Sequence, residues 1–155
     1  KPSATTHFSW RSGNMSIYKA FEHQHVPEIL QSLHKLQPSF DGAIDFIPYR
    51  GDFPRGIFCT AVVRAEVDAR QVVGLYQNFY ADAVFTHYVD RPIDMKQVVG
   101  TNKCLVHVDV HGDKILVTSC IDNLLKGASG QAVQNMNLMF GLEENCGLQL
   151  KSLAF

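Results

Sequence analysis

The stretch Lys103–Ile121, KCLVHVDVHGDKILVTSCI, predicts a β-hairpin and decides the fold class. In its first half apolar and polar residues alternate, which gives a strand one apolar and one polar face. The apolar residues are Val106, Val108 and Val110, and the polar ones are His107, Asp109 and His111. Gly112 and Asp113, between the two halves, suit a two-residue type II′ turn with glycine first.

The elements before the hairpin alternate between helix and strand. Residues 1–14 are predicted to be a loop and residues 15–21 a short strand or extended arm. Pro27 predicts the start of a helix that ends before Pro38. Two strands are predicted over residues 43–50 and 56–67, a helix over 69–83 with Asp68 as N-cap, a short strand over 84–90, and mostly loop over 91–102.

After the hairpin, Asp122 is predicted to cap a long helix that ends at Phe140. Gly141 then falls at the C′ position, where glycine commonly ends a helix. Because at least one strand pair is a direct hairpin while helices are interspersed, we expect an α+β domain. Its sheet should be mixed, with helices packed on it.

Composition excludes several classes of partner. The 155 residues are 46% hydrophobic, enough for one domain with a core. With 14 basic and 15 acidic residues and no basic cluster, nucleic acid is not expected as the main partner. The longest apolar run is far short of the roughly 20 residues of a membrane span. The four cysteines show no metal-type spacing and are predicted to be reduced core thiols in a cytosolic protein.

The stretch FEHQHVPEI, residues 21–29, contains the best candidate for acid–base chemistry. If it is extended, His23 and His25 project to the same side. His25 would lie just before a helix N-terminus, whose partial positive charge favours a neutral ring, and Glu28 could orient an imidazole or offset that effect. The alternatives are an exposed capping region with incidental histidines, or a metal site.

The stretch 121–142, IDNLLKGASGQAVQNMNLMFGL, is rich in glycine and amides. It matches neither the GxxxxGK[ST] nor the GxGxxG nucleotide-binding pattern. One helical face carries small and amide residues that would suit a close partner, namely Gly127, Gly130, Gln131 and Gln134. The opposite face is predicted to be buried and consists of Leu125, Ala128, Ala132, Met136 and Phe140.

Metal binding is not predicted. His107, Asp109 and His111 share one strand face and could in principle hold a metal. However, polar residues on the outer face of a hairpin need no special cause.

Four stretches resemble, in order, the C-terminal domain of the N-acetyl-gamma-glutamyl-phosphate reductases, over about Ser16 to Leu148. They are HQHVPEI, FIPYRGDFPRGI, VVGTN and the glycine-rich stretch itself. The resemblance implies the C-terminal fold of semialdehyde and glyceraldehyde-3-phosphate dehydrogenases. It also implies an NADPH-dependent, cytoplasmic oxidoreductase of arginine biosynthesis, which reduces an acyl phosphate to an aldehyde and releases phosphate.

The resemblance also implies roles for particular residues. His25 corresponds to the acid/base that serves a cysteine nucleophile, with His23 as the close alternative and Glu28 as the orienting partner. Arg55 is expected to hold a substrate carboxylate or phosphate, and Asn102 is a weaker substrate-binding candidate. The residues expected nearest the nicotinamide are Gly127, Gln131 and Asn135.

The family's dinucleotide-binding domain and its Asn-Pro-Gly-Cys-type nucleophile precede the region matching Lys1, and neither occurs here. The lack of an initiator Met also hints at a cut from a longer chain. We therefore expect the chain alone to be inactive. Residues 1–121 are predicted to bind substrate, supply the base and form a homodimer or homotetramer. Residues 122–142 should pack on the cofactor domain, and 143–155 form a tail.

Two other functions are compatible with the sequence. A sister reductase acting on aspartyl or aminoadipyl phosphate would keep the fold and the base but change the carboxylate clamp. A non-catalytic assembly module would contribute only oligomer contacts.

Overall fold

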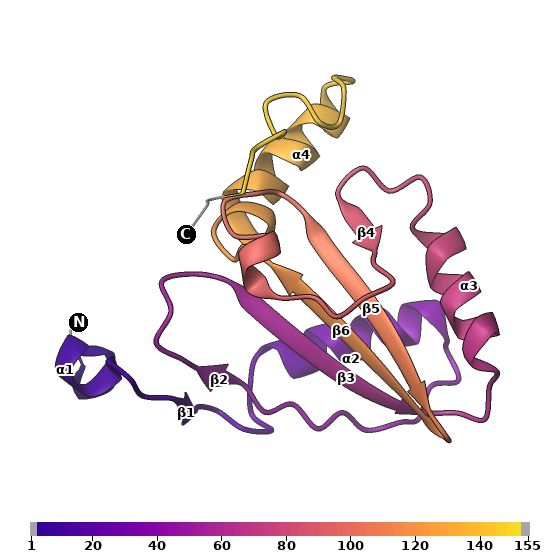
Figure 1. Cartoon of the computed structure of the whole chain (residues 1–155), viewed down its shortest axis with the longest axis horizontal. Coiled ribbons are helices and arrows are strands. Elements are labelled where there is room, and N and C mark those ends of the chain that lie inside the picture. Colours follow the sequence, from indigo (N-terminus) through magenta and orange to yellow (C-terminus); the bar gives the residue numbers. More distant parts are fainter. Residues whose placement is uncertain (1–2, 153–155) are drawn as a thin grey trace. The chain divides into compact units, whose positions relative to one another are not determined.

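The computed structural model describes residues 3–152. The chain divides into two compact units, one ending at Phe53 and the other beginning at Pro54. Figure 1 shows their helices and strands. Within the described residues, no helix is both long and apolar enough to cross a membrane. The predicted division after residue 121 stays a prediction.

The first unit contains short elements around one longer helix. They are η1 (Ala4–Thr6), α1 (Phe8–Arg11), β1 (Ser16–Ile17), α2 (His25–Leu36) and β2 (Tyr49–Arg50). The prediction of a loop over residues 1–14 is wrong, because η1 and α1 lie within it. These helices are held by local caps: the Ser9 N–H donates to His7 Nδ1 at 3.3 Å. Helices this short show no hydrophobic periodicity from which they could be predicted.

The helix at Pro27 is confirmed as α2, which begins two residues earlier than the proline and ends before Pro38. The predicted strand over 43–50 shrinks to β2, which pairs antiparallel with β1. α1 is joined to β2 as well, since Arg11 Nη1 donates to the Arg50 carbonyl oxygen at 2.7 Å.

The second unit is built on a four-stranded sheet in the order β3-β6-β5-β4. The strands are β3 (Ile57–Arg64), β4 (Thr86–Tyr88), β5 (Cys104–His111) and β6 (Lys114–Ile121). β6 pairs antiparallel with both β3 and β5, whereas β4 and β5 are parallel. The helical segments are α3 (Ala69–Phe79), η2 (Met95–Gln97), η3 (Leu125–Ser129) and α4 (Gly130–Met139). The predicted α+β class with a mixed, largely antiparallel sheet is confirmed.

The hairpin turn has the predicted geometry. Gly112 has a φ of 61°, and Asp113 is not among the residues with positive φ, which is the sign pattern of a type II′ turn. Asp68 is confirmed as the N-cap of α3, since its Oδ1 accepts from the Arg70 and Gln71 N–H groups at 2.9 and 3.2 Å.

The polar face predicted for β5 is not exposed along its length. His107 is only 5% exposed, because β5 is an inner strand and residues 89–98 lie against this face. Its Nδ1 is 2.8 Å from the Val89 carbonyl oxygen and its Nε2 is 3.1 Å from Asp109 Oδ2. Both ring nitrogens are therefore engaged by protein groups. Among the described residues, no group of three or more His, Cys, Asp or Glu side chains is arranged to hold a metal.

The sheet carries a small core on each face. On one, Val72 of α3 packs with Val108 and Ile115. On the other, the residues that pack together are Ile93, Val98, Leu105 and Cys120. All four cysteines are free thiols, but the prediction that they belong to the core is wrong for Cys59 and Cys146, which are exposed. Burial, with Cys104 and Asp94 nearby, raises the pKa of Cys120 to about 11.

The C-terminal helix differs from the prediction at its start and matches it at its end. It begins as one π-helical turn, η3, and continues as α4. Gly141 has a φ of 68°, its N–H donates to the Leu138 carbonyl, and the Leu142 N–H donates to the Asn137 carbonyl at 2.8 Å. These two bonds form a Schellman motif, so the C′ glycine is confirmed.

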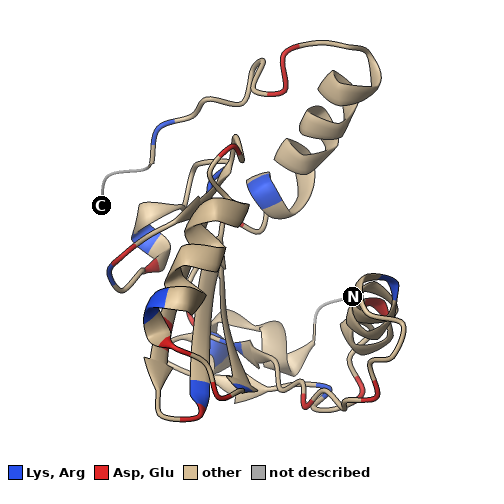
Figure 2. Cartoon of the chain, turned by 90° about the vertical axis from the view of Figure 1, so that its right-hand side faces the viewer, with Lys and Arg blue, Asp and Glu red and all other residues tan. Residues whose placement is uncertain are grey.

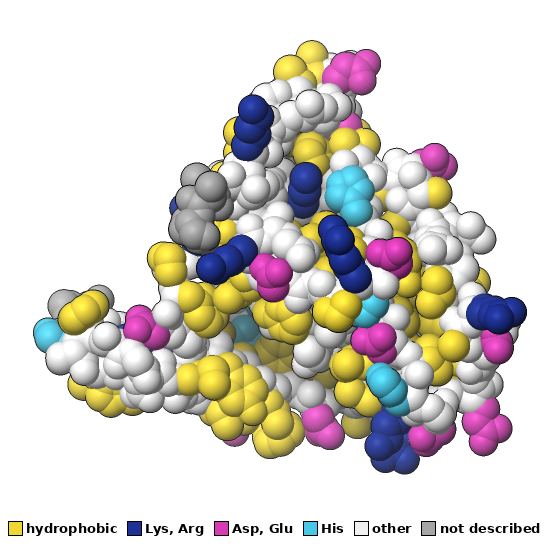
Figure 3. All heavy atoms as spheres, in the orientation of Figure 1, with side chains coloured by type: hydrophobic (Ala, Val, Ile, Leu, Met, Phe, Trp, Pro, Cys, Tyr) yellow, Lys and Arg dark blue, Asp and Glu magenta, His cyan; other side chains and the backbone are white. Residues whose placement is uncertain are grey.

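Burial along this helix differs from the prediction, although Leu125 is half-buried and Gly127 is exposed. Ala128, Ala132, Met136 and Phe140, predicted to be buried, are exposed, with Phe140 at 74%. Gly130 is buried, and Gln131 and Gln134 are half-buried. Buried Asn102, in the turn before β5, lies against Gly130. The face of the helix that carries Gly130 therefore packs against this turn. Figure 3 shows hydrophobic side chains at the surface around the end of α4.

Gly130→Ala should lower the free energy of unfolding by about 1–3 kcal/mol, the usual cost of overpacking. A Cβ on Gly130 would overlap Asn102 Oδ1 and lie 2.8 Å from the Leu125 carbonyl oxygen. Gly127→Ala is the matched control, because a Cβ there meets its nearest neighbour, Ile121 Cδ1, at an ordinary 3.4 Å. Urea unfolding of the two variants measures the difference. Equal shifts in midpoint would contradict this account of the helix approach.

Candidate functional site

The carboxylate of Asp122 joins three separate segments of the second unit. Asp122 is 0% exposed. Its Oδ2 accepts from the Gly100 N–H at 2.8 Å and from Arg55 Nη1 at 3.1 Å. Its Oδ1 accepts from the Leu124 and Leu125 N–H groups at 2.8 and 3.0 Å. The segment before β3, the turn before β5 and the start of the C-terminal helix therefore meet at one charge.

Neighbouring hydrogen-bond donors and Arg55 stabilise the negative charge of Asp122. Burial alone would raise the pKa of this carboxyl group. The hydrogen bonds from Gly100, Leu124 and Leu125, together with Arg55, outweigh burial and lower the pKa below its ordinary value of 3.8. Asp122 is thus ionised at neutral pH and acts as a fixed structural anion.

Arg55 is held by this anion but keeps access to solvent. Its side chain is 30% exposed, and a single nitrogen, Nη1, contacts Asp122. Next to it, the Gly56 N–H donates to Asn123 Oδ1 at 2.7 Å, so Asp122 and Asn123 together fix residues 55 and 56. The remaining N–H groups of the guanidinium could bind a carboxylate or phosphate.

Asn102 has a structural environment. It is 2% exposed, and its Nδ2 donates to the Leu148 carbonyl oxygen at 2.8 Å. Its Oδ1 lies against Gly130 and is, among the described residues, a buried polar atom without a hydrogen-bond partner. Asn102 therefore connects the turn before β5 with α4 and with the segment after it, rather than facing an open surface.

The segment after α4 is anchored rather than a free tail. Asn137, 1% exposed, donates through Nδ2 to the carbonyl oxygens of Glu144 and Cys146 at 3.1 and 3.0 Å. Leu148 is 5% exposed. Two buried asparagines thus hold residues 144–148, a contribution that no sequence pattern identified.

The candidate histidines lie in the first unit on a tightly turned segment. Residues 21–25 do not meet the condition of an extended segment, because Lys19 and Phe21 have positive φ values of 45° and 63° and the chain turns. The His23 and His25 rings nevertheless lie close, with centroids 4.5 Å apart and ring planes 67° apart. The turn is supported by the Phe21 N–H, which donates to the Phe46 carbonyl oxygen at 2.8 Å.

His23 is fixed as a neutral ring in this arrangement. Its Nδ1 accepts from the His25 backbone N–H at 3.2 Å, which requires a free lone pair on that nitrogen. Partial burial and the proximity of His25 and Lys19 lower the pKa of His23. His23 is half-buried next to Tyr18 and Phe46, with ring centroids 5.5 and 5.2 Å away. His25 lies at the first position of α2 and is exposed.

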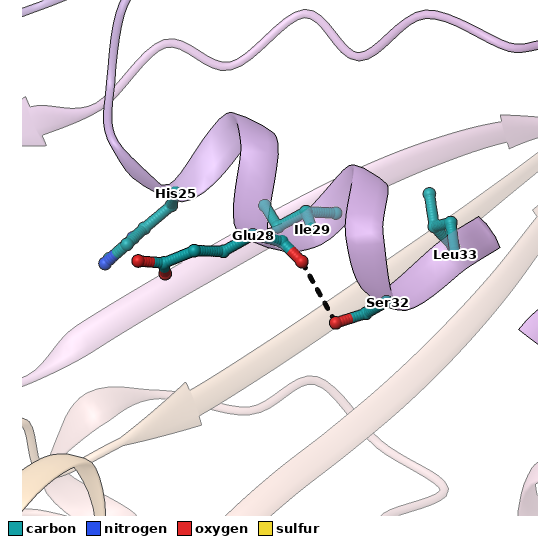
Figure 4. Close-up of a pocket in the computed structure, with 5 residues that line it drawn as sticks. All are labelled: His25, Glu28, Ile29, Ser32 and Leu33. Atoms are coloured by element: carbon teal, nitrogen blue, oxygen red, sulfur yellow. Dashed lines mark hydrogen bonds between the residues drawn. The ribbon is translucent and has the colours of Figure 1, made fainter. Parts of the chain in front are cut away.

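His25 and Glu28 share one side of α2. Figure 4 shows both side chains directed to the same side of the helix, with the ring and the carboxylate next to each other. Together with Ile29, Ser32 and Leu33 they line an open hollow of about 360 Å³. Such an exposed imidazole beside a carboxylate can accept and donate protons.

The structure thus brings the predicted residues together in two sets, one in each unit. His23, His25 and Glu28 form the first. Arg55 and Asn102 belong to two segments that Asp122 joins, through its bonds to Arg55 and to the Gly100 N–H. The sequence predicts Asp122 only as a helix cap, although an Asp-Asn pair just before a helix offers two acceptors and is compatible with a wider role.

Comparison with known proteins assigns the family. The family model of the semialdehyde dehydrogenase dimerisation domain matches residues 1–123. The chain belongs to this family. All the motifs described above lie within that match, except the part of the C-terminal helix after residue 123.

Close relatives of this dimerisation-domain chain share one name. The chain is 68% identical over all 155 residues to the N-acetyl-gamma-glutamyl-phosphate reductase of Bacteroides fragilis, and it covers 48% of that protein. The proteins of the same name from Parabacteroides distasonis and Azobacteroides pseudotrichonymphae are 57% and 52% identical, again over 155 residues and 48% of their length. The chain spans about half the length of the curated relatives it matches.

A solved structure supports the fold of the dimerisation-domain family. Aspartate semialdehyde dehydrogenase II of Vibrio cholerae, in complex with ASA, matches with a TM-score of 0.56 and 20% identity. The match covers 76% of this chain and 37% of that one. At this identity the likeness establishes the fold alone.

Asp122→Asn should lower the free energy of unfolding at pH 7 by about 2–4 kcal/mol, because it removes the buried charge that pairs with Arg55 and accepts hydrogen bonds from three backbone N–H groups. The folded-state pKa is depressed, so the stabilisation is present above the ordinary value of 3.8 and is lost as pH falls through the folded pKa. Urea unfolding at several pH values measures this. In the variant, the free energy of unfolding should lack this pH-dependent contribution.

Asp113→Asn is the matched control for this experiment. Asp113 pairs with Arg64 at 3.7 Å, and both side chains are largely exposed. An exposed pair contributes about 0–1 kcal/mol. Similar losses for the two aspartates would contradict the anchoring role of Asp122.

Proposed function

We propose that this chain is the substrate-binding and acid–base half of an NADPH-dependent N-acetyl-gamma-glutamyl-phosphate reductase of the cytoplasm. The observation that carries the proposal is 68% identity to a protein of that name over the whole chain. The reaction reduces an acyl phosphate to an aldehyde and releases phosphate. It requires a dinucleotide-binding domain and a nucleophilic cysteine from outside this sequence.

In this proposal His25 moves the proton of the reacting thiol. Its ring is exposed at the first position of α2, within reach of a group supplied from outside the unit. A neutral imidazole takes the thiol proton, and the thiolate attacks the acyl carbon with loss of phosphate to give a thioester. NADPH, when bound, would supply the hydride that reduces the thioester. The protonated His25 would return its proton to the oxygen of the resulting thiohemiacetal, which would then collapse to the aldehyde and the thiol.

Glu28 and His23 support that base. Glu28 lies beside the His25 ring on one side of α2 and would stabilise its protonated form. His23 accepts from the His25 backbone N–H and so uses the nitrogen that a base would need. This contact favours His25 over His23 as the acid/base.

Arg55 is proposed to bind the substrate carboxylate or phosphate, since its side chain is partly exposed and is oriented by Asp122. Asn102 would act through the turn that it anchors. The residues proposed to face the nicotinamide are Gly127, Gln131 and Asn135. They fit a flat, amide-bearing ring, because Gly127 is exposed without a side chain and Asn135 is an exposed amide.

The protein is proposed to be a homodimer or homotetramer that associates through the sheet. β3 is an edge strand whose residues are all exposed in the single chain. Its large apolar side chains are 45–64% exposed, and they are Ile57, Phe58, Val62 and Val63. An exposed apolar edge of this kind needs a partner in a stable protein.

The proposal predicts activity only when the missing half is restored. We expect no NADPH oxidation by the isolated chain, but turnover when the chain is fused behind the N-terminal half of the Bacteroides fragilis relative. In that fusion, His25→Ala should lower kcat by about a hundred- to ten-thousandfold, the usual loss of a general acid–base. Aspartyl and aminoadipyl phosphates, assayed in parallel, should be poorer substrates than N-acetyl-gamma-glutamyl phosphate.

His34→Ala is the control, because His34 is an exposed histidine near the other end of α2. It should leave kcat within about twofold, as surface substitutions usually do. If His25→Ala behaves like His34→Ala in an active fusion, the base assignment is wrong and an assembly role is favoured.

A further inference from the structure

One lysine organises the polar face of the C-terminal helix. Lys126 Nζ donates to Gln131 Oε1 at 3.0 Å and to Gln134 Oε1 at 2.8 Å. The residues from 127 to 142 include no charged side chain, so the ammonium stands alone at the beginning of the helix, and the next charges are Glu143 and Glu144 (Figure 2).

The π-helical turn makes this contact possible. Lys126 and Gln131 are five residues apart, a spacing that i→i+5 hydrogen bonding brings onto one face. In an α-helix, neighbours on one face are three or four residues apart. After the change to α4 at Gly130, Gln134 and Asn135 follow Gln131 at those α-helical spacings. The irregular start of the helix thus places one lysine over two glutamines.

The hydrogen bonds have a fixed direction. A lysine ammonium only donates, so both glutamine oxygens face it and both NH₂ groups face away. Gln131 Nε2 donates to Asn135 Oδ1 at 3.3 Å, which leaves the Asn135 NH₂ group directed outward. On the other branch, Gln134 Nε2 donates to Glu144 Oε1 at 2.6 Å. A carboxylate only accepts hydrogen bonds. Glu144 therefore requires the Gln134 NH₂ group to face it, which is the same amide orientation that Lys126 requires.

The environment of Lys126 strengthens these contacts. The side chain is half-buried, and its Nζ lies 5.7 Å from the centroid of the Phe85 ring. Burial lowers the pKa of Lys126, while Cys104 and Glu144 act in the opposite direction. Partial exclusion of water makes each hydrogen bond stronger than it would be at an exposed site.

We propose that Lys126 is a positioning residue that orients the carboxamides of Gln131 and Asn135. The exposed Asn135 NH₂ group then offers N–H donors to the carbonyl oxygen of the nicotinamide carboxamide. The identity of this ligand rests on the proposed function. The orientation of the two amides by Lys126 does not.

The first test needs no enzyme activity and uses the chain itself. In ¹⁵N NMR spectra, exchange of the Gln131 and Gln134 side-chain NH₂ protons with water should be about tenfold faster in Lys126→Met than in the wild type. Without the lysine on its oxygen, each amide can rotate and lose the bond from its NH₂ group to Asn135 or Glu144. Lys96→Met, a change at an exposed lysine in η2, should leave both exchange rates unchanged. Unchanged exchange in Lys126→Met would overturn the proposal.

The second test uses the active fusion and separates KM from kcat. Lys126→Met should raise KM for NADPH about three- to tenfold, the effect of one weakened hydrogen bond, and leave KM for the acyl phosphate unchanged. In a Gln131→Leu background, Lys126→Met should raise KM for NADPH little further, because the lysine acts through that glutamine. Additive effects on KM for NADPH would overturn the orienting role.

If Lys126→Met does not fold, Gln131→Leu tests the contact between Lys126 and Gln131 by changing the glutamine instead of the lysine. It should change the Asn135 NH₂ signals and leave the Gln134 NH₂ protons protected by their bond to Glu144, because Lys126 still holds the Gln134 carbonyl oxygen. Equal loss at both amides would contradict the two-branch arrangement. If the amide exchange responds as expected but the fusion has no NADPH-dependent activity, the positioning role stands and the proposed function fails.

Discussion

The buried carboxylate of Asp122 is the constraint on which the second unit depends. An ionised group that is 0% exposed is unfavourable unless hydrogen bonds and an opposite charge compensate it. Here three backbone N–H groups and one guanidinium provide that compensation. Because the donors come from three separate segments, the carboxylate fixes their relative positions. Arg55 owes its orientation, and the C-terminal helix its starting point, to the same group.

The C-terminal helix shows how tertiary contacts decide what periodicity leaves open. Gly141 as the C′ residue followed from local rules and holds. Asp122 was predicted as the cap, and it does accept from the Leu124 and Leu125 N–H groups, but the N-cap position itself is occupied by Leu124. Which face of the helix is buried did not follow from the sequence. Apolar residues such as Met136 and Phe140 favoured one face, but the fit of Gly130 against Asn102 selects the other. The π-helical start is equally invisible in the sequence, because no residue pattern marks it.

The candidate acid–base residues were predictable as a set but not in their geometry. The spacing of His23, His25 and Glu28 before a helix indicated that their side chains would lie together. Positive φ values at Lys19 and Phe21, unusual for non-glycine residues, depend on backbone contacts such as that of Phe21 with Phe46. Those contacts join residues far apart in the sequence. They leave His25 exposed and give His23 the role of a hydrogen-bond acceptor.

The central claim, that one carboxylate joins three segments, is tested most directly by following backbone amides through an NMR pH titration. The amide protons of Gly100, Leu124 and Leu125 should shift together, with one common pKa below 3.8, because all three donate to Asp122. The same shifts should be missing in a chain with asparagine at position 122. If the three amides titrate independently, or do not titrate in the wild type, the account is contradicted.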